Sequence, residues 1–94
     1  MPIIRIIRSE TVDRQMYETV STAIDLEREH PLGLLMHAAG EVDGRWQIVN
    51  VWEAREYADK FDEEVLEPAI RELTGEEHKG REIKTYEVEH LVTP

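Results

Sequence analysis

Hydrophobic and polar residues alternate most clearly on either side of Asp43-Gly44. These two residues lie within the segment Gly33–Glu53 and separate two strand-like runs. An Asp-Gly pair in this position is a strong signal for a β-hairpin, because its tight turn needs positive φ angles that both residues tolerate. The turn also fixes the register of the two strands, and the register decides which side chains share a face. We expect His37 to lie opposite Asn50.

In the register that pairs Val42 with Arg45, the hairpin has two different apolar faces. A slip by one residue would mix them. The first face combines aromatic, aliphatic and polar side chains, as the wall of a pocket does; it consists of Leu35, His37, Trp46, Ile48, Asn50 and Trp52. The second face is typical of an ordinary core and consists of Leu34, Met36, Ala38, Val49 and Val51.

The residues before the hairpin predict one strand and one helix. Pro2–Arg8 is rich in isoleucine, which is typical of a strand buried on much of both faces. Apolar residues then recur at helical spacing from Val12 to about Arg28. Ser9 or Thr11 can cap this helix, because a hydroxyl accepts a hydrogen bond from an unpaired N–H of the first turn.

A second helix is predicted after the hairpin, from about Ala54 to Leu73. Pro68 lies inside it and lacks the N–H that a helix interior needs, so we expect a kink or a break near Glu64–Glu67. The last segment, Arg81–Val92, alternates and predicts a final strand. The apolar stripe of the second helix consists of Ala58, Phe61, Val65, Ala69 and Leu73.

The resulting order of elements predicts an α+β, ferredoxin-like fold, with residues 1–94 as one domain. In this fold two helices cover one face of a four-stranded antiparallel sheet. We expect them to cover the face that carries Val49, which leaves the tryptophan face bare. Such an apolar patch is larger than a monomer usually exposes. The sequence therefore predicts a homodimer, sheet against sheet, with His37 and Asn50 in the cavity between the sheets.

Composition narrows the range of partners. The formal net charge is −10, which argues against nucleic acid and against an anionic membrane surface. The acids concentrate in Glu53–Glu77, which indicates a solvated helical surface; an acidic docking patch for a basic partner is the alternative. Cysteine is absent and no apolar run is long enough to span a membrane, so we expect residence in the cytoplasm.

The strand order and two stretches of sequence resemble the dimeric α/β-barrel superfamily, and within it the antibiotic biosynthesis monooxygenase-like group. The stretches are GLLMHAAG…DGRWQIVNVWEA and YADKFDEEVLEPAIREL, and the most specific piece is Val51-Trp52-Glu53 leading into the second helix. The resemblance implies a homodimer with a cavity beneath the helices or between the sheets. Members include cofactor-independent monooxygenases acting on aromatic polyketides, haem-degrading and haem-dependent enzymes, and lactone isomerases. The fold does not decide among these chemistries.

His37 and Asn50 are the candidate catalytic residues. His37 can accept a proton near neutral pH, and Asn50 can orient a substrate carbonyl or stabilise an enolate. The alternative is purely structural, with the two side chains satisfying each other across the strands. The candidate substrate-binding residues are Leu35, Ile48 and Trp52, with Trp46 nearer the rim and Tyr86 of the last strand completing a partner's cavity; each can equally be packing.

The motifs of several common chemistries are missing from the sequence. There is no HExxH, P-loop, GxGxxG or GxSxG, so we expect neither a metal nor a cofactor. The leading hypothesis is a cofactor-independent oxygenase acting on a small aromatic or polyketide-like molecule, which itself supplies electrons to O₂. The first rival is a non-catalytic ligand-binding or structural dimer. The second is a haem-binding or haem-degrading protein, although Asn50, Trp52 and His37 match no haem-degrading motif position by position.

Overall fold

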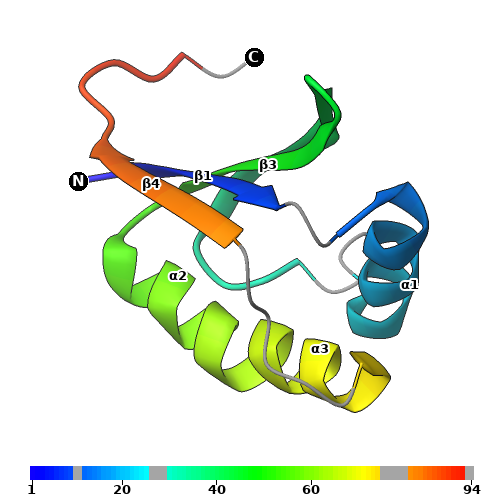
Figure 1. The fold of residues 1–94 in the computed structure, drawn as a ribbon. Helices are drawn as coiled ribbons and strands as arrows, with labels where there is room; N and C mark the ends of the chain where they lie inside the picture. Colours follow the sequence, from blue (N-terminus) through cyan, green and yellow to red (C-terminus); the bar gives the residue numbers. More distant parts are fainter. Residues whose placement is uncertain (10–11, 26–29, 75–80, 93–94) are drawn as a thin grey trace.

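The computed structural model describes residues 1–9, 12–25, 30–74 and 81–92. Its strands are β1 (Ile3–Ser9), β2 (Leu34–Val42), β3 (Arg45–Trp52) and β4 (Arg81–Glu87). Its helices are α1 (Arg14–Ile24), α2 (Arg55–Phe61) and α3 (Glu67–Thr74), with a π-helical turn at Asp62–Leu66 between α2 and α3. The strands form one antiparallel sheet in the order β2-β3-β1-β4, and the helices lie on one side of it (Figure 1). The predicted α+β, ferredoxin-like fold is confirmed.

The hairpin of β2 and β3 has the predicted turn and most of the predicted register. Asp43 and Gly44 have φ angles of 51° and 78°, as a primed turn requires. His37 lies opposite Asn50, as expected, and Val42 pairs with Arg45. At the open end the prediction is wrong, as described next.

A β-bulge changes the pairing of Trp52. Leu34 pairs with Trp52, whereas Met36 pairs with Val51, so Leu35 is an extra residue in its strand. Its side chain is 42% exposed. The turn alone could not predict this, because a bulge adds one residue without disturbing the register nearer the turn.

The helices cover the tryptophan face of the hairpin, not the face that carries Val49. Trp52 is only 2% exposed and forms a core cluster with Ile3 and Ala58, and its ring centroid lies 5.5 Å from that of Phe61. Both hairpin faces are apolar, so alternation alone could not distinguish them. The bulkier side chains fill the space between sheet and helices. The predicted cavity between two sheets is therefore wrong, and the cavity lies beneath the helices of a single chain.

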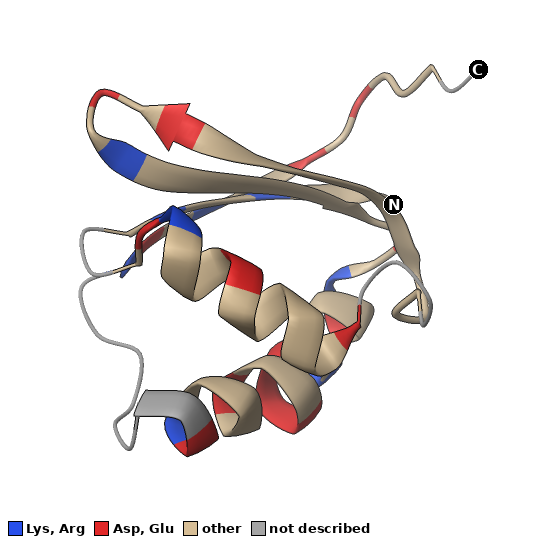
Figure 2. Cartoon of the chain, turned by 90° about the vertical axis from the view of Figure 1, so that its right-hand side faces the viewer, with Lys and Arg blue, Asp and Glu red and all other residues tan. Residues whose placement is uncertain are grey.

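The outer face of the sheet is partly exposed and is apolar except toward one end, where Arg8, Gln47, Glu82 and Lys84 lie. It faces away from the helices, whereas acidic residues lie on the helices (Figure 2). Met36 and Tyr86 are 46% and 51% exposed. The apolar side chains that the strand register places on this face include Ile4, Ile6, Met36, Val49 and Tyr86.

The cap of α1 is Asp13 and not Ser9. The Asp13 side chain accepts a hydrogen bond of 2.8 Å from the Met16 N–H, three residues along, which is the usual reach of a capping side chain. Ser9 instead accepts a bond of 3.1 Å from the Val12 N–H, in the segment before the helix. Thr11, the other predicted cap, lies outside the described residues.

The irregularity predicted from Pro68 is a π-helical turn and not a break. The Glu67 N–H donates to the carbonyl of Asp62, five residues back. Pro68 follows directly after this wider turn, and the helix accommodates its missing N–H there without a break. The wider turn shifts the apolar stripe by one residue. Leu66 lines the cavity, whereas the predicted Val65 is 37% exposed.

The last strand belongs to the sheet of its own chain. β4 pairs with β1, and it ends at Glu87 and not at Val92. Just beyond it, the Val88 N–H donates to the carbonyl of Pro2 over 2.9 Å. In the described part of the chain, no helix is both long and apolar enough to cross a membrane.

Candidate functional site

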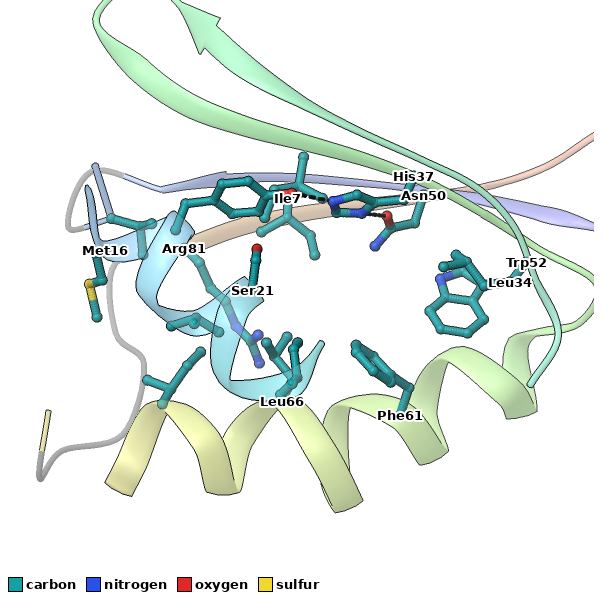
Figure 3. A pocket seen from close by; sticks show the side chains of 16 residues that line it. Ile7, Met16, Ser21, Leu34, His37, Asn50, Trp52, Phe61, Leu66 and Arg81 are labelled. Atoms are coloured by element: carbon teal, nitrogen blue, oxygen red, sulfur yellow. Dashed lines mark hydrogen bonds between the residues drawn. The ribbon is translucent and has the colours of Figure 1, made fainter. Parts of the chain in front are cut away.

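A cavity of about 60 Å³, the inner cavity, lies between the sheet and the helices (Figure 3). Its walls are mostly aliphatic and aromatic side chains, among them Ile48, Trp52, Phe61 and Leu66. An apolar cavity of roughly 150 Å³ can bind benzene, and the inner cavity is well below that size, so as it stands it is too small for an aromatic ligand. Its polar lining consists of Tyr17, Ser21, His37, Asn50 and Arg81.

Three of these polar residues form a chain of hydrogen bonds. The Nδ1 atom of His37 lies 2.6 Å from Oδ1 of Asn50, and its Nε2 atom is bonded to the hydroxyl of Tyr17. An amide oxygen only accepts, so Nδ1 carries the proton, and Nε2 of the neutral ring accepts the Tyr17 proton. Asn50 thus holds His37 in the tautomer with the proton on Nδ1 and a lone pair on Nε2. This is the arrangement of an oriented general base.

Asn50 has a second function available to it. It is 8% exposed, in the central strand β3, between Arg5 of β1 and His37 of β2. Figure 3 shows its amide oxygen toward His37 and its amide nitrogen on the cavity side. The amide can therefore orient the imidazole and donate a hydrogen bond to an oxygen atom in the cavity.

Ion pairs join two strands of the sheet, β1 and β4, to the helical segment after the hairpin. Arg5, with a side chain 8% exposed, donates to Asp59 over 3.0 Å and to Asp62 over 3.1 Å. Burial raises the pKa of the Asp62 carboxyl, and Arg5 opposes this shift. Arg81 of β4 forms an ion pair with Glu67 of α3. Asp62 and Glu67 are therefore partly buried, whereas the other described acids between Glu53 and Glu72 are exposed, as the sequence predicted.

The structure brings four of the predicted site residues together and separates three. His37, Asn50, Ile48 and Trp52 all line the inner cavity. Leu35 does not, and Leu34 takes its place because of the bulge. Tyr86 pairs with Ile4 on the outer face, away from the cavity.

Trp46 lies beside the inner cavity and not in its wall. It is 9% exposed, and its ring centroid is 5.1 Å from that of Tyr17. It lines a second space of about 360 Å³ between the hairpin turn and the start of α1. We call this space the outer recess; it is lined by Ser9, Val12, Asp13, Arg14, Glu41, Gly44 and Trp46.

The polar residues of the cavity lining that were not predicted from the sequence are Tyr17, Ser21 and Arg81. Tyr17 precedes Val20 by three residues and Ile24 by seven, so it shares their helix face, and this spacing was a usable signal. Arg81 gave no comparable signal, because it follows a polar loop. The described residues contain no group of three or more His, Asp and Glu side chains arranged to hold a metal ion.

Comparison with known proteins gives a clear result only for the fold. No protein-family model matches the sequence, and no curated protein matches it. In contrast, many solved structures match the three-dimensional structure of the chain. One is a Deinococcus radiodurans protein assigned provisionally to the antibiotic biosynthesis monooxygenases. It is 16% identical, with a TM-score of 0.67, and the match covers 100% of this chain and 98% of that protein. The chain has the fold of the antibiotic biosynthesis monooxygenase-like proteins.

Two further structures with this fold carry different chemistry. SnoaB, a cofactor-independent oxygenase from Streptomyces nogalater, is 12% identical, with a TM-score of 0.66 and 99% and 98% of the chains covered. The haem-degrading MhuD from Mycobacterium tuberculosis is 21% identical, with a TM-score of 0.57 and 96% and 99% covered; its structure holds two haems in the active site. At these identities the likeness extends to the fold alone.

Proposed function

We propose that this chain is a cofactor-independent oxygenase that acts on a small aromatic ketone or phenol. The observation that carries the proposal is the hydrogen-bonded chain of Tyr17, His37 and Asn50 in the wall of an apolar cavity. Cofactor-independent oxygenation needs little from a protein beyond a base, a donor for the developing oxyanion and exclusion of water. The fold shared with SnoaB is further support.

The proposed reaction begins with removal of a proton from a ring CH₂ group that is conjugated to the substrate carbonyl through the aromatic ring. His37 Nε2 accepts this proton, while the Asn50 amide nitrogen donates to the enolate oxygen. The enolate then reduces O₂. When a ring CH₂ becomes a carbonyl, one oxygen atom enters the substrate, and the other leaves as water with the two hydrogens of the CH₂ group. The substrate supplies all the electrons, so the reaction balances without a flavin or a metal.

Anthrone is a suitable test compound, because it enolises and its oxidation to anthraquinone follows this stoichiometry. We expect the protein to accelerate O₂ consumption and quinone formation, and His37→Ala to abolish the acceleration. His30→Ala is the matched control, since His30 is exposed and lies outside the cavity. Equal turnover by His37→Ala and the unaltered protein would refute the assignment of the base.

We also propose that the protein is a homodimer, joined through the outer face of the sheet. Met36 and Tyr86 are about half exposed on that face, and a second copy would bury them. Native mass spectrometry is expected to give twice the chain mass, and Met36→Glu to shift the population toward monomer. A monomeric unaltered protein at micromolar concentration contradicts the proposal.

Haem binding is a second candidate, favoured by the fold shared with MhuD. It requires a much larger cavity than the present 60 Å³ and the release of His37 from one of its two bonds. A Soret band that appears with haemin and disappears in His37→Ala would favour it over the oxygenase. A purely structural dimer is the remaining alternative, and it predicts neither turnover nor a Soret band.

A further inference from the structure

We propose that the outer recess is the outer half of the ligand site and that Tyr17 is the gate between it and the inner cavity. In this arrangement Trp46 donates its indole N–H to a carbonyl oxygen of a neutral aromatic ligand. The inference deepens the proposed function, because it assigns a ligand site to the same base, but it concerns binding and can be tested without turnover.

The first argument is that the two spaces share a wall. Val12 lines both of them. Tyr17 lines the inner cavity and Trp46 lines the recess, and the two rings are in contact, with centroids 5.1 Å apart and planes inclined by 41°. The Tyr17 side chain therefore lies at the boundary between the spaces.

The second argument is size. Small-molecule sites usually have volumes of roughly 300–1,000 Å³, and the inner cavity of about 60 Å³ cannot hold a substrate alone. The outer recess, at about 360 Å³, is large enough but does not reach His37. Rotation of Tyr17 would join the two spaces and uncover Nε2 of His37 in the same movement. This rotation breaks the bond of Tyr17 to His37 and its ring contact with Trp46 and leaves the backbone of α1 in place.

The third argument is an unsatisfied donor. The indole Nε1 of Trp46 is buried and has no hydrogen-bond acceptor among the described residues. Leaving a buried donor unpaired costs about 1–3 kcal/mol, so such a group is a reason to look for an acceptor that arrives from outside. Trp46 lines the recess, but its Nε1 atom is covered in this structure, so in the proposed arrangement a ligand reaches this donor once the neighbouring Tyr17 ring has turned aside.

The ligand class follows from these surroundings. The aromatic rings of Tyr17 and Trp46 favour an aromatic ligand over an aliphatic one. The unpaired indole N–H calls for an oxygen acceptor such as a carbonyl. Two acids, Asp13 and Glu41, line the recess against one cation, Arg14, which disfavours an anionic ligand, and the apolar ring contacts disfavour a charged one of either sign, so the ligand is expected to be neutral.

The test uses 1-tetralone, a neutral bicyclic aryl ketone, and ¹⁵N-labelled protein. The two tryptophans give two indole N–H resonances, which Trp46→Phe assigns. We expect 1-tetralone to shift the Trp46 resonance more than that of Trp52. Trp46→Phe is expected to weaken binding by about 3- to 10-fold, the usual effect of one lost hydrogen bond.

The gate is tested by the rate of association in stopped-flow fluorescence. Tyr17→Ala removes the ring and is expected to raise the association rate several-fold. Tyr17→Phe keeps the ring and removes only the bond to His37, so it is the matched control and should change the rate less. His30→Ala, which is exposed and lines neither space, should leave both affinity and rate unchanged.

Three outcomes overturn the inference. They are no resonance shift up to the solubility limit, a shift confined to Trp52, and an unchanged association rate in Tyr17→Ala. If 1-tetralone behaves as expected while anthrone is not oxidised, the ligand site stands and the oxygenase assignment falls. If anthrone is oxidised but 1-tetralone does not shift the Trp46 resonance, the oxygenase assignment stands and the ligand site falls.

Discussion

The bond between His37 and Asn50 predicts a measurable coupling in the stability of the protein. The perturbation is a double-mutant cycle with His37→Phe, Asn50→Leu and the variant that carries both. Each single change leaves a polar partner without its bond in a largely buried place, and each is expected to lower the free energy of unfolding by about 1–3 kcal/mol. Because the double variant removes both partners, its loss should be smaller than the sum of the single losses by about 1 kcal/mol.

This magnitude depends on burial. Asn50 is 8% exposed in the middle of the sheet, and the Nδ1–Oδ1 distance is 2.6 Å, so water cannot easily replace the lost partner. In a domain of this size, 1 kcal/mol corresponds to a change of about 4–8 °C in Tm. Urea unfolding followed by circular dichroism measures the coupling, at one protein concentration for all variants so that association does not enter the comparison.

The matched control is the bond between Arg8 and Gln47 on the neighbouring strands β1 and β3. It has a similar length, 2.8 Å, but it is exposed. Water can replace either partner, so the cycle of Arg8→Ala and Gln47→Ala should give a coupling near zero. The reasoning is refuted if His37 and Asn50 are additive, or if their coupling is no larger than that of the exposed pair.

Three other changes have clear expected outcomes. Trp52→Ala empties the core between Ile3 and Phe61 and should cost about 3–5 kcal/mol in thermal unfolding. Gly33→Ala should lower Tm, because Gly33 has a φ of +84° and a Cβ there would collide with the Tyr57 ring. Gly40→Ala is the control, because a Cβ at Gly40 has no atom within 4 Å. Burial raises the pKa of the Asp62 carboxyl above 3.8 in the folded protein. The protonated carboxyl therefore stabilises the fold fully below pH 3.8, and this stabilisation is lost as the pH rises through the raised pKa. Asp62→Asn should remove the corresponding fall in the urea midpoint with rising pH.

The hairpin and the order of elements could be predicted because their signals are local. Asp43-Gly44 determines a turn from two residues, and apolar spacing separates helix from strand within short windows. The pairing of His37 with Asn50 follows from the turn by counting. Leu35 was misplaced because a bulge depends on contacts at the far end of the hairpin, which no local pattern contains.

The choice of the buried face could not be made from alternation. Both faces of β3 are apolar, and only the bulk of Trp52 against Val51 distinguishes them. The pairing of His37 with Asn50 was therefore predicted correctly, but the face of the sheet that the helices cover was not. Tyr17 could not be assigned to His37 for another reason, because their contact joins a helix to a strand 20 residues away, and no local pattern contains such a contact.

The π-helical turn has a consequence for changes in chain length. It contains one residue more than an α-helical path between Phe61 and Leu66 would need. Deleting Glu63 would leave Leu66 four residues after Phe61, which is the α-helical spacing that keeps both on the cavity side. The deletion alone would bring Pro68 into a helix interior, so Pro68→Ala must accompany it. With both changes, the removal of a residue from the middle of a helix becomes tolerable at this one position.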